Sequence, residues 1–351
     1  MKKPTKFWTF IIILLIPLVL VAGIVILMDP FFHYHKPIPG VSYLISEERY
    51  QNDGIVRHFD YEAIITGSSE TQSFKTSDFE RIFGTSCVKT CFAGGTFKEV
   101  DDLVRTGISA NPNIKYVVRS LDLNMINDEP DTLGYDEYPT YLYNKDPFDD
   151  YEYIFNKQVF LTIGEDFLST LRGIPTTSFD EYASVADYKE YGKDAVLRTF
   201  TRVDEIDEEM VFEEADYDRV KRNLEANIIK TARENPQITF YYFIPPYSVC
   251  YWDATVRSNS LDYVLTEEEY AIELLLDVDN IKVFSFSSDI DMTGNLDNYF
   301  DTLHFSSAIN AEILQWMHDG TGLITKDNYH DEINREREIY SSYDYDEIFE
   351  Q

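Results

Sequence analysis

The chain has 351 residues and a net charge of −33, from 63 acidic and 30 basic residues. Such a surface repels phosphate, which excludes nucleic acid as a partner and disfavours binding to anionic lipid headgroups. Aromatic residues make up 15% of the chain, which also excludes a disordered acidic tail, because such tails lack the side chains to fold.

The first element is an uncharged apolar run from Phe7 to Met28, long enough for a helix that crosses a bilayer. Lysines precede this run and acidic residues dominate the rest of the chain, a charge pattern that keeps the N-terminus inside. A cleaved signal peptide is the alternative, but its apolar core is normally shorter and ends at small residues. We therefore predict a cytoplasmic segment 1–6, a transmembrane anchor 7–28 and an extracytoplasmic domain, in a single-pass protein of the cell membrane.

After residues 29–60, which we interpret as a stalk and lead-in, short apolar runs alternate with helical stretches. The expected strands are 63–66, 87–92, 115–121, 238–244 and 281–286, and the expected helices are 71–83, 96–110, 217–234, 266–276 and 306–317. This alternation predicts the α/β class, as a three-layer domain around a parallel sheet over residues 61–325. Residues 125–215 interrupt it and are predicted to be an insertion that walls the cleft, and 326–351 an acidic tail.

The three cysteines, Cys87, Cys91 and Cys250, show neither a metal-ligand spacing nor an even disulfide framework. Cys87 and Cys91 are about 13 Å apart along an extended strand, too far for a disulfide between them. Buried small apolar side chains are the favoured interpretation. No metal ion or organic cofactor is expected.

Gly67-Ser68-Ser69-Glu70 directly follows the predicted strand 63–66 and opens a predicted helix. In an open α/β sheet this position faces the ligand site, and the N–H groups at a helix start stabilise developing negative charge. Either serine could instead serve only as the N-cap of the helix. The tetrapeptide alone leaves both interpretations open.

A second motif, Asp301-Thr302-Leu303-His304, stands just before the last predicted helix of the domain. An Asp three residues before a His, across a turn, can bind Nδ1–H and leave Nε2 free as a base. A structural role is the usual interpretation of a single histidine. Together with the strand–GSS–helix pattern, however, the motif favours a catalytic pair.

Two further strand ends have residues suited to bind a developing negative charge. Gly94 and Gly95 follow the second strand, where glycine lets a backbone N–H approach a ligand closely, although an ordinary turn explains them equally well. Asp122 and Asn124 follow the third strand and add polar side chains at the same edge of the sheet.

The order of these motifs resembles the SGNH hydrolase superfamily. Its blocks are G-D-S or G-S-S, a glycine after the second strand, an asparagine after the third, and a C-terminal D-x-x-H. The resemblance covers roughly residues 60–125 and 236–320 of this chain. With its anchor, outward domain and G-S-S-E sequence, the chain is most similar to DltD-like envelope acyl-transfer proteins.

This resemblance implies a role for each candidate residue. Ser69 would be the nucleophile, His304 its base, and Asp301 the residue that orients His304. The N–H groups of Gly94 or Gly95 would bind the oxyanion, together with that of Ser69.

The third block departs from the family pattern, because Ser120 takes the glycine place and Asp122 the asparagine place, with Asn124 two residues late. Asp122 and Asn124 are thus candidate oxyanion or substrate-binding residues, and the third oxyanion donor stays unassigned.

The function that the resemblance implies is serine-dependent acyl transfer, of the O-acylation or D-alanylation type. The acceptor would be a cell-envelope polysaccharide or teichoic-acid-like polymer, with a membrane O-acyltransferase as a candidate partner. An esterase that removes acyl groups from an envelope glycan is one alternative. A glycan- or partner-binding module on a decayed site is the other.

Overall fold

The computed structural model describes residues 5–135, 138–144 and 146–349. They form two compact units. Unit 1 joins the chain up to Phe59 with residues 138–178. Unit 2 contains residues 60–135 and 179–349. All the residues predicted to form the catalytic site belong to unit 2.

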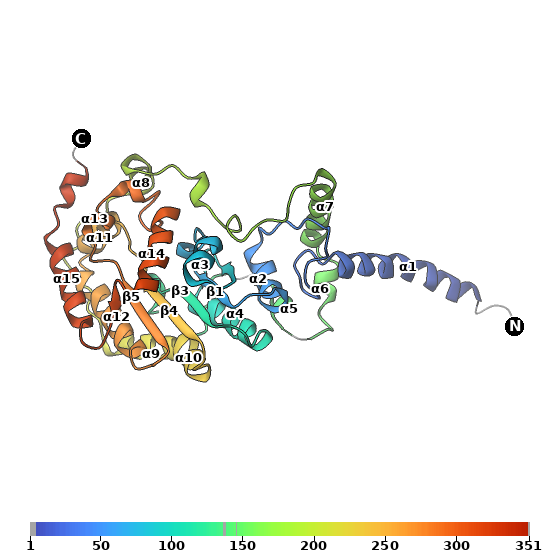
Figure 1. Ribbon diagram of the computed structural model, residues 1–351, viewed down its shortest axis with the longest axis horizontal. Coiled ribbons are helices and arrows are strands. Elements are labelled where there is room, and N and C mark those ends of the chain that lie inside the picture. Colours follow the sequence, from blue (N-terminus) through green and yellow to red (C-terminus); the bar gives the residue numbers. More distant parts are fainter. Residues whose placement is uncertain (1–4, 136–137, 145, 350–351) are drawn as a thin grey trace. The chain divides into compact units, whose positions relative to one another are not determined.

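Unit 2 is built on a six-stranded sheet in the order β2-β1-β3-β4-β5-β6, with helices on both faces (Figure 1). The strands are β1 Ala63–Gly67, β2 Cys87–Cys91, β3 Tyr116–Ser120, β4 Thr239–Ile244, β5 Ile281–Ser285 and β6 Leu323–Ile324. Neighbours among β1 to β5 are parallel, whereas β6 pairs antiparallel with β5. The predicted α/β class is confirmed. The sheet is mixed rather than wholly parallel, because the chain turns back at Gly320 and Gly322, both with positive φ, to add β6.

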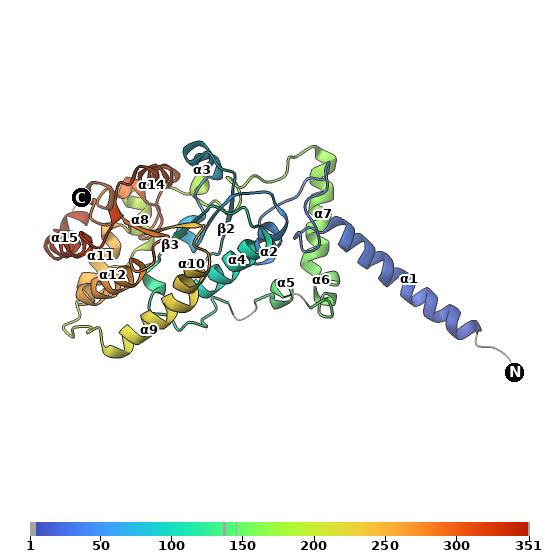
Figure 2. The same ribbon diagram turned by 60° about the horizontal axis from the view of Figure 1, so that its bottom comes forward.

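The main helices of unit 2 alternate with these strands, as the sequence predicts. They are α3 Thr76–Phe83, α4 Phe97–Ala110, α8 Lys193–Thr199, α9 Glu214–Leu224, α10 Lys230–Glu234, α11 Val249–Arg257, α12 Leu261–Leu275, α13 Ile290–Thr293, α14 Ser307–Asp319 and α15 Tyr329–Ser342. Figure 2 shows α3 and α14 on one face of the sheet and α4, α10 and α12 on the other. The sequence predicts none of α8, α11, α13 and α15. It also misses the late start of α3, which a separate 3-10 turn, η1 Ser69–Thr71, precedes.

Unit 1 contains α1 Thr5–Met28, α2 Glu48–His58, α5 Thr140–Tyr143, α6 Tyr151–Ile154 and α7 Lys157–Arg172. Within α1, Trp8–Met28 is long and apolar enough to cross a membrane. The residues after α1 differ from the predicted stalk, because Phe31, Phe32 and Tyr43 are fully buried. Apolar side chains at these positions build a small core of their own, which a stalk does not need.

Two other predicted boundaries also differ from the structure. The predicted insertion 125–215 divides between the units: residues 138–178 belong to unit 1, whereas 125–135 and the residues from Phe179 belong to unit 2. The predicted acidic tail forms α15, in which Ile333 and Tyr340 are buried. Tyr340 stacks on the buried ring of Trp252, with 4.1 Å between the ring centroids. Such contacts join residues far apart in sequence, so local composition does not reveal them.

Candidate active site

Ser69 follows β1 through a turn that requires glycine. Gly67 has φ of +146°, a conformation that residues with a Cβ rarely adopt. A Cβ there would lie 2.4 Å from Ser120 Oγ and 2.8 Å from Thr71 Cγ2. The close approach of β3 and η1 to Gly67 places Ser69, which is half-buried, at the start of η1 and at the carboxyl edge of the sheet.

A buried lysine fixes the chain just after this turn. Lys89 lies in β2 and is fully buried. Its Nζ donates hydrogen bonds to the backbone carbonyls of Gln72, at 2.5 Å, and Phe74, at 2.9 Å. An ammonium group can be buried only when such partners replace water, so these bonds hold the Ser69 loop against the sheet. Sequence reasoning missed Lys89, although a lysine inside the apolar strand CVKTC is a visible signal.

The structure brings Ser69, His304 and Asp301 into one line. Ser69 Oγ lies 2.6 Å from His304 Nε2. On the other side of the ring, His304 Nδ1 lies 2.8 Å and 2.9 Å from the two carboxylate oxygens of Asp301. Asp301 Oδ1 also accepts the backbone N–H groups of Leu303 and His304, at 2.9 Å and 2.8 Å. The tight turn therefore fixes the carboxylate before the histidine ring binds it, which is the geometry predicted for the D-x-x-H motif.

Charge around His304 favours its protonated form. Burial lowers the pKa of His304, but the hydrogen bond and charge of Asp301, with the charges of Glu70 and Asp122, outweigh burial and leave the pKa above 6.5. Burial raises the pKa of the Asp301 carboxyl. The hydrogen bond and charge of His304 lower it by more, so the pKa of Asp301 lies below its ordinary value of 3.8. A carboxylate held ionised beside an imidazole stabilises the imidazolium that forms when the ring accepts a proton.

A second acidic pair lies behind the serines. Glu70 is buried and accepts a short hydrogen bond from Ser68 Oγ. Burial, followed by the charge of Asp122, raises the pKa of Glu70 to about 7. Ser68 Oγ lies 3.3 Å from Asp122 Oδ2, so Ser68 bridges the two acids. The sequence places Glu70 in the motif but gives no sign that it is buried.

Asp122 is oriented as a hydrogen-bond acceptor. Its Oδ1 accepts from Tyr247 Oη at 2.7 Å, and from the backbone N–H and side-chain Nδ2 of Asn124, each at 3.0 Å. Asn124 therefore directs its backbone N–H and one Nδ2 hydrogen to Asp122, and Asp122 is the acceptor in each of these bonds. These bonds do not use the second Nδ2 hydrogen of Asn124, so its predicted oxyanion or substrate-binding role stays a prediction.

The two glycines after β2 have different positions. The Gly95 N–H donates to the carbonyl of Phe92 at 2.8 Å, which closes the turn before α4. The predicted oxyanion role is therefore wrong for Gly95. Gly94 is exposed, has φ of +58°, and would meet no atom within 4 Å if it had a Cβ. It remains the glycine whose N–H is suited to a ligand.

Part of the predicted insertion lies beside His304. The ring of Phe300 stacks on that of His304 at 5.2 Å, and Tyr191 packs edge-on against Phe300 at 5.7 Å. A pocket of about 280 Å³ opens here. Its lining is Tyr188, Lys189, Glu190, Ala195, Arg198, Thr199, Phe300 and Asp301. Residues 188–199 of the predicted insertion thus line a pocket beside Asp301, but neither Ser69 nor His304 lines it. That the insertion walls the cleft above Ser69 stays a prediction.

Other features of unit 2 do not extend this site. A larger pocket of about 570 Å³ lies between β5, β6 and α15, and none of the predicted site residues lines it. Among the described residues, no group of three or more His, Cys, Asp or Glu is arranged to hold a metal ion. Cys87, Cys91 and Cys250 are buried thiols.

Comparison with known proteins gives little. No family model matches the chain, and no curated protein matches it. A solved structure from Streptococcus pneumonia, provisionally named a platelet activating factor, is similar over 78% of this chain and 92% of its own, with 12% identity and a TM-score of 0.42. At this identity and TM-score, the similarity assigns neither a family nor an activity.

Proposed function

We propose that this chain is a membrane-anchored enzyme that transfers acyl groups through Ser69 outside the cell. The observation that supports this proposal best is the continuous hydrogen-bonded line from Ser69 Oγ through His304 to Asp301, with contacts of 2.6 Å and 2.8 Å. A serine hydroxyl is a weak nucleophile until an adjacent base accepts its proton, and this geometry supplies that base.

The reaction begins when Ser69 Oγ attacks the carbonyl carbon of an ester and His304 Nε2 accepts the serine proton. His304 then gives this proton to the departing alkoxide, which leaves as an alcohol, and the acyl group stays on Ser69. A second hydroxyl attacks the acyl-enzyme, His304 takes its proton, and Ser69 is released with that proton. Asp301 keeps the ring oriented throughout.

The developing oxyanion needs N–H donors at the mouth of the sheet. The candidates are the N–H of Ser69, at the start of η1, and that of Gly94 in the exposed turn after β2. Asp122 stands where the resemblance implies a third donor, and as an acceptor it would oppose the oxyanion charge. We therefore expect slow turnover with simple esters.

We further propose that the second hydroxyl belongs to an envelope polysaccharide or teichoic-acid-like polymer. The apolar α1 supports an anchored position with the N-terminus inside. A membrane O-acyltransferase is a candidate source of the acyl group. If water attacks instead of the polymer, the same residues make an esterase.

The test is covalent labelling of the purified full-length chain in detergent with a serine-directed fluorophosphonate. We expect label on Ser69, and we expect Ser69→Ala and His304→Ala to abolish it. Ser68→Ala is the matched control, because it removes the neighbouring hydroxyl, and it should weaken labelling less.

A folded wild-type chain with no label on Ser69, and with no acyl-enzyme mass after treatment with simple esters, would refute the proposal. That result would favour a binding module instead. The acidic Asp122 at a donor position is the feature that supports this second function, since it opposes catalysis without disturbing the fold.

A further inference from the structure

Helix α7 of unit 1 turns its apolar side toward the outside. Phe160, Leu161, Phe167, Leu168 and Leu171 are exposed, with exposed fractions from 41% to 68%. At 3.6 residues per turn, they occupy one arc of the helix surface about 120° wide. A helix of a water-soluble domain normally buries such an arc.

The opposite side of α7 is mainly polar, and it is this side that unit 1 buries. Thr162, Asp166 and Ser169 are buried there, together with the apolar Val159. Asp166 Oδ1 accepts the backbone N–H of Leu44 at 2.8 Å, and Thr170 Oγ1 accepts that of Ser42 at 2.9 Å. These bonds fix the rotation of α7, so the helix cannot turn its apolar arc inward without leaving buried polar groups unpaired.

The C-terminal end of α1 packs against the same helix. Val25 of α1 is fully buried in a cluster that includes Tyr153 and Val159, with Ile163 packed against it. Figures 1 and 2 show α7 crossing beside that end of α1. Val25 lies about 5 Å before the end of α1 along the helix axis. If α1 spans the bilayer, α7 therefore lies at the outer interface of the bilayer.

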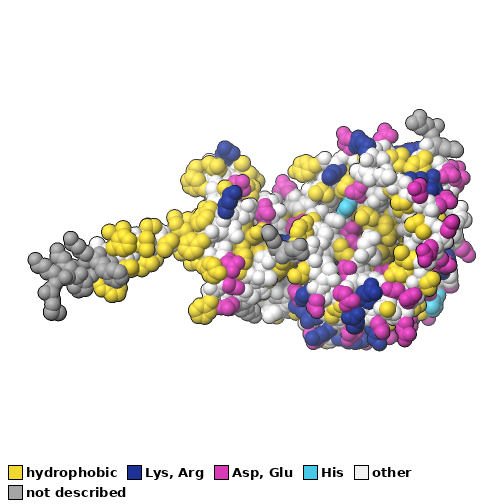
Figure 3. Space-filling view, turned by 180° about the vertical axis from the view of Figure 1, so that it is seen from behind, with side chains coloured by type: hydrophobic (Ala, Val, Ile, Leu, Met, Phe, Trp, Pro, Cys, Tyr) yellow, Lys and Arg dark blue, Asp and Glu magenta, His cyan; other side chains and the backbone are white. Residues whose placement is uncertain are grey.

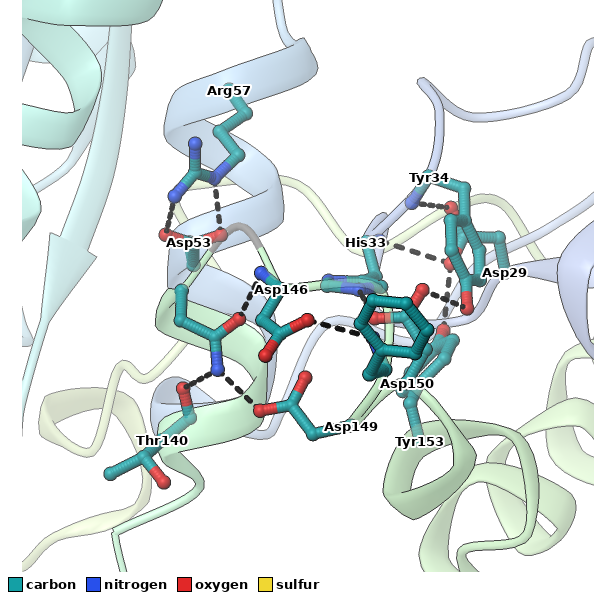
Figure 4. Close-up of polar contacts among 12 residues, drawn as sticks. Asp29, His33, Tyr34, Asp53, Arg57, Thr140, Asp146, Asp149, Asp150 and Tyr153 are labelled. Carbon is teal, nitrogen blue, oxygen red and sulfur yellow. Dashed lines mark hydrogen bonds and ion pairs between the residues drawn. The ribbon is translucent and has the colours of Figure 1, made fainter.

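The turn that leaves α1 is fixed by a buried carboxylate. Asp29 Oδ1 accepts the backbone N–H of His33 at 3.0 Å and the hydroxyl of Tyr153 at 2.7 Å. Its Oδ2 accepts the backbone N–H of Tyr34 at 2.8 Å (Figure 4). The same oxygen accepts the backbone N–H of His35 at 2.9 Å. Tyr153 belongs to α6, immediately before α7 in the chain. The carboxylate thus joins the end of the anchor firmly to the α6–α7 segment.

We propose that the apolar arc of α7 inserts into the outer interface of the lipid bilayer. Apolar side chains continue from the anchor onto the adjoining part of unit 1, as Figure 3 shows. Phe148, Tyr151 and Phe155, just before α7, are also exposed and would lie at the same interface. Amphipathic helices of this kind bury their apolar side roughly 5–10 Å deep at the headgroup boundary. The net charge of −33 favours zwitterionic over anionic lipid.

This inference goes beyond the proposed acyl transfer, although it uses the proposed membrane anchor. Unit 1 is then a base seated on the membrane rather than a flexible tether. The anchor alone would hold the chain at the membrane. The contribution of α7 is to fix the orientation of unit 1 on the membrane surface.

The test places an environment-sensitive nitrobenzoxadiazole fluorophore at Leu168→Cys in the full-length chain, reconstituted in phosphatidylcholine vesicles. The native cysteines are all buried, so the engineered thiol is the one that reacts in the folded protein. Val211→Cys is the matched control, because Val211 is exposed at 62% but lies in unit 2. Lipids with a doxyl quencher near the glycerol report the depth of each fluorophore.

We expect the fluorophore at position 168 to emit at shorter wavelength and to be quenched several-fold more strongly than the one at position 211. Equal, water-like emission at both positions would overturn the proposal. Shielding of position 168 in native membranes but not in pure lipid vesicles would also overturn it, since a membrane protein would then cover α7. Fluorophosphonate labelling of Ser69 is measured on the same samples, so failure of this proposal is distinguishable from failure of the proposed chemistry.

Discussion

Replacement of Glu70 by Gln is expected to stabilise unit 2 at alkaline pH. Glu70 is fully buried, and its pKa is about 7 in the folded chain against an ordinary value of 4.5. The unfolded chain therefore releases this proton at lower pH than the folded chain, and wild-type stability falls as pH rises from about 4.5 to about 7. The difference between the two pKa values corresponds to about 3 kcal/mol at pH 8, and to less than about 1 kcal/mol at pH 5.

Glu70→Gln keeps the size of the side chain and an oxygen that can accept from Ser68 Oγ, but it has no proton to lose. We expect its free energy of unfolding to exceed that of wild type by about 2 kcal/mol more at pH 8 than at pH 5. The measurement is urea unfolding of the full-length chain in detergent at both pH values, followed by tryptophan fluorescence. Trp252, buried in unit 2, is the principal reporter.

Glu338→Gln is the matched control, because it changes the net charge equally at an exposed position of α15. We expect it to shift stability by the same small amount at both pH values. The reasoning is refuted if Glu70→Gln gives the same stability difference from wild type at pH 5 and pH 8. It is also refuted if that variant loses more stability at pH 8 than at pH 5.

Two further predictions concern the chemistry. Asp122→Asn replaces a hydrogen-bond acceptor beside the serines by a potential donor, and one oxyanion donor is worth about 10²–10³ in rate. We expect the variant to hydrolyse simple esters at least tenfold faster than wild type. An unchanged or slower rate would contradict the role assigned to Asp122. Asp301→Asn removes the main group that raises the pKa of His304. The fluorophosphonate labelling rate increases with pH as His304 loses its proton, and in the variant we expect this increase at a lower pH than in wild type. The maximum rate should fall by a factor of about 10³ or more. An increase at the same pH as in wild type would show that Asp301 does not set the pKa of His304.

Periodicity and local motifs in the sequence predicted those features of the protein that depend on residues close together in the chain. The apolar run of α1 predicted a helix of membrane length, because any bilayer-spanning helix needs that length. Strand–helix alternation predicted the α/β class, because parallel strands need crossovers. The motifs around Ser69 and His304 also predicted a catalytic pair, because a serine at a strand end and an Asp three residues before a His are suited to act together.

Only the tertiary structure decided which polar groups are buried and what they contact. The sequence does not show whether Glu70 lies in solvent or in a closed site. In the structure, burial beside Asp122 raises the pKa of Glu70 to about 7. Tyr247, which donates to Asp122 Oδ1 at 2.7 Å, is more than 120 residues away in the sequence, so no local motif reveals this contact.

The apolar residues of α7 recur at helical spacing in the sequence, although no helix was predicted there because residues 125–215 were interpreted as an insertion. The sequence did not determine which side of the helix unit 1 buries. That choice depends on backbone N–H groups of residues 42 and 44, which need acceptors and find them in Thr170 and Asp166. These contacts span more than 120 residues of sequence, and unpaired buried N–H groups are costly, so the polar side is held inward and the apolar side is left for the membrane.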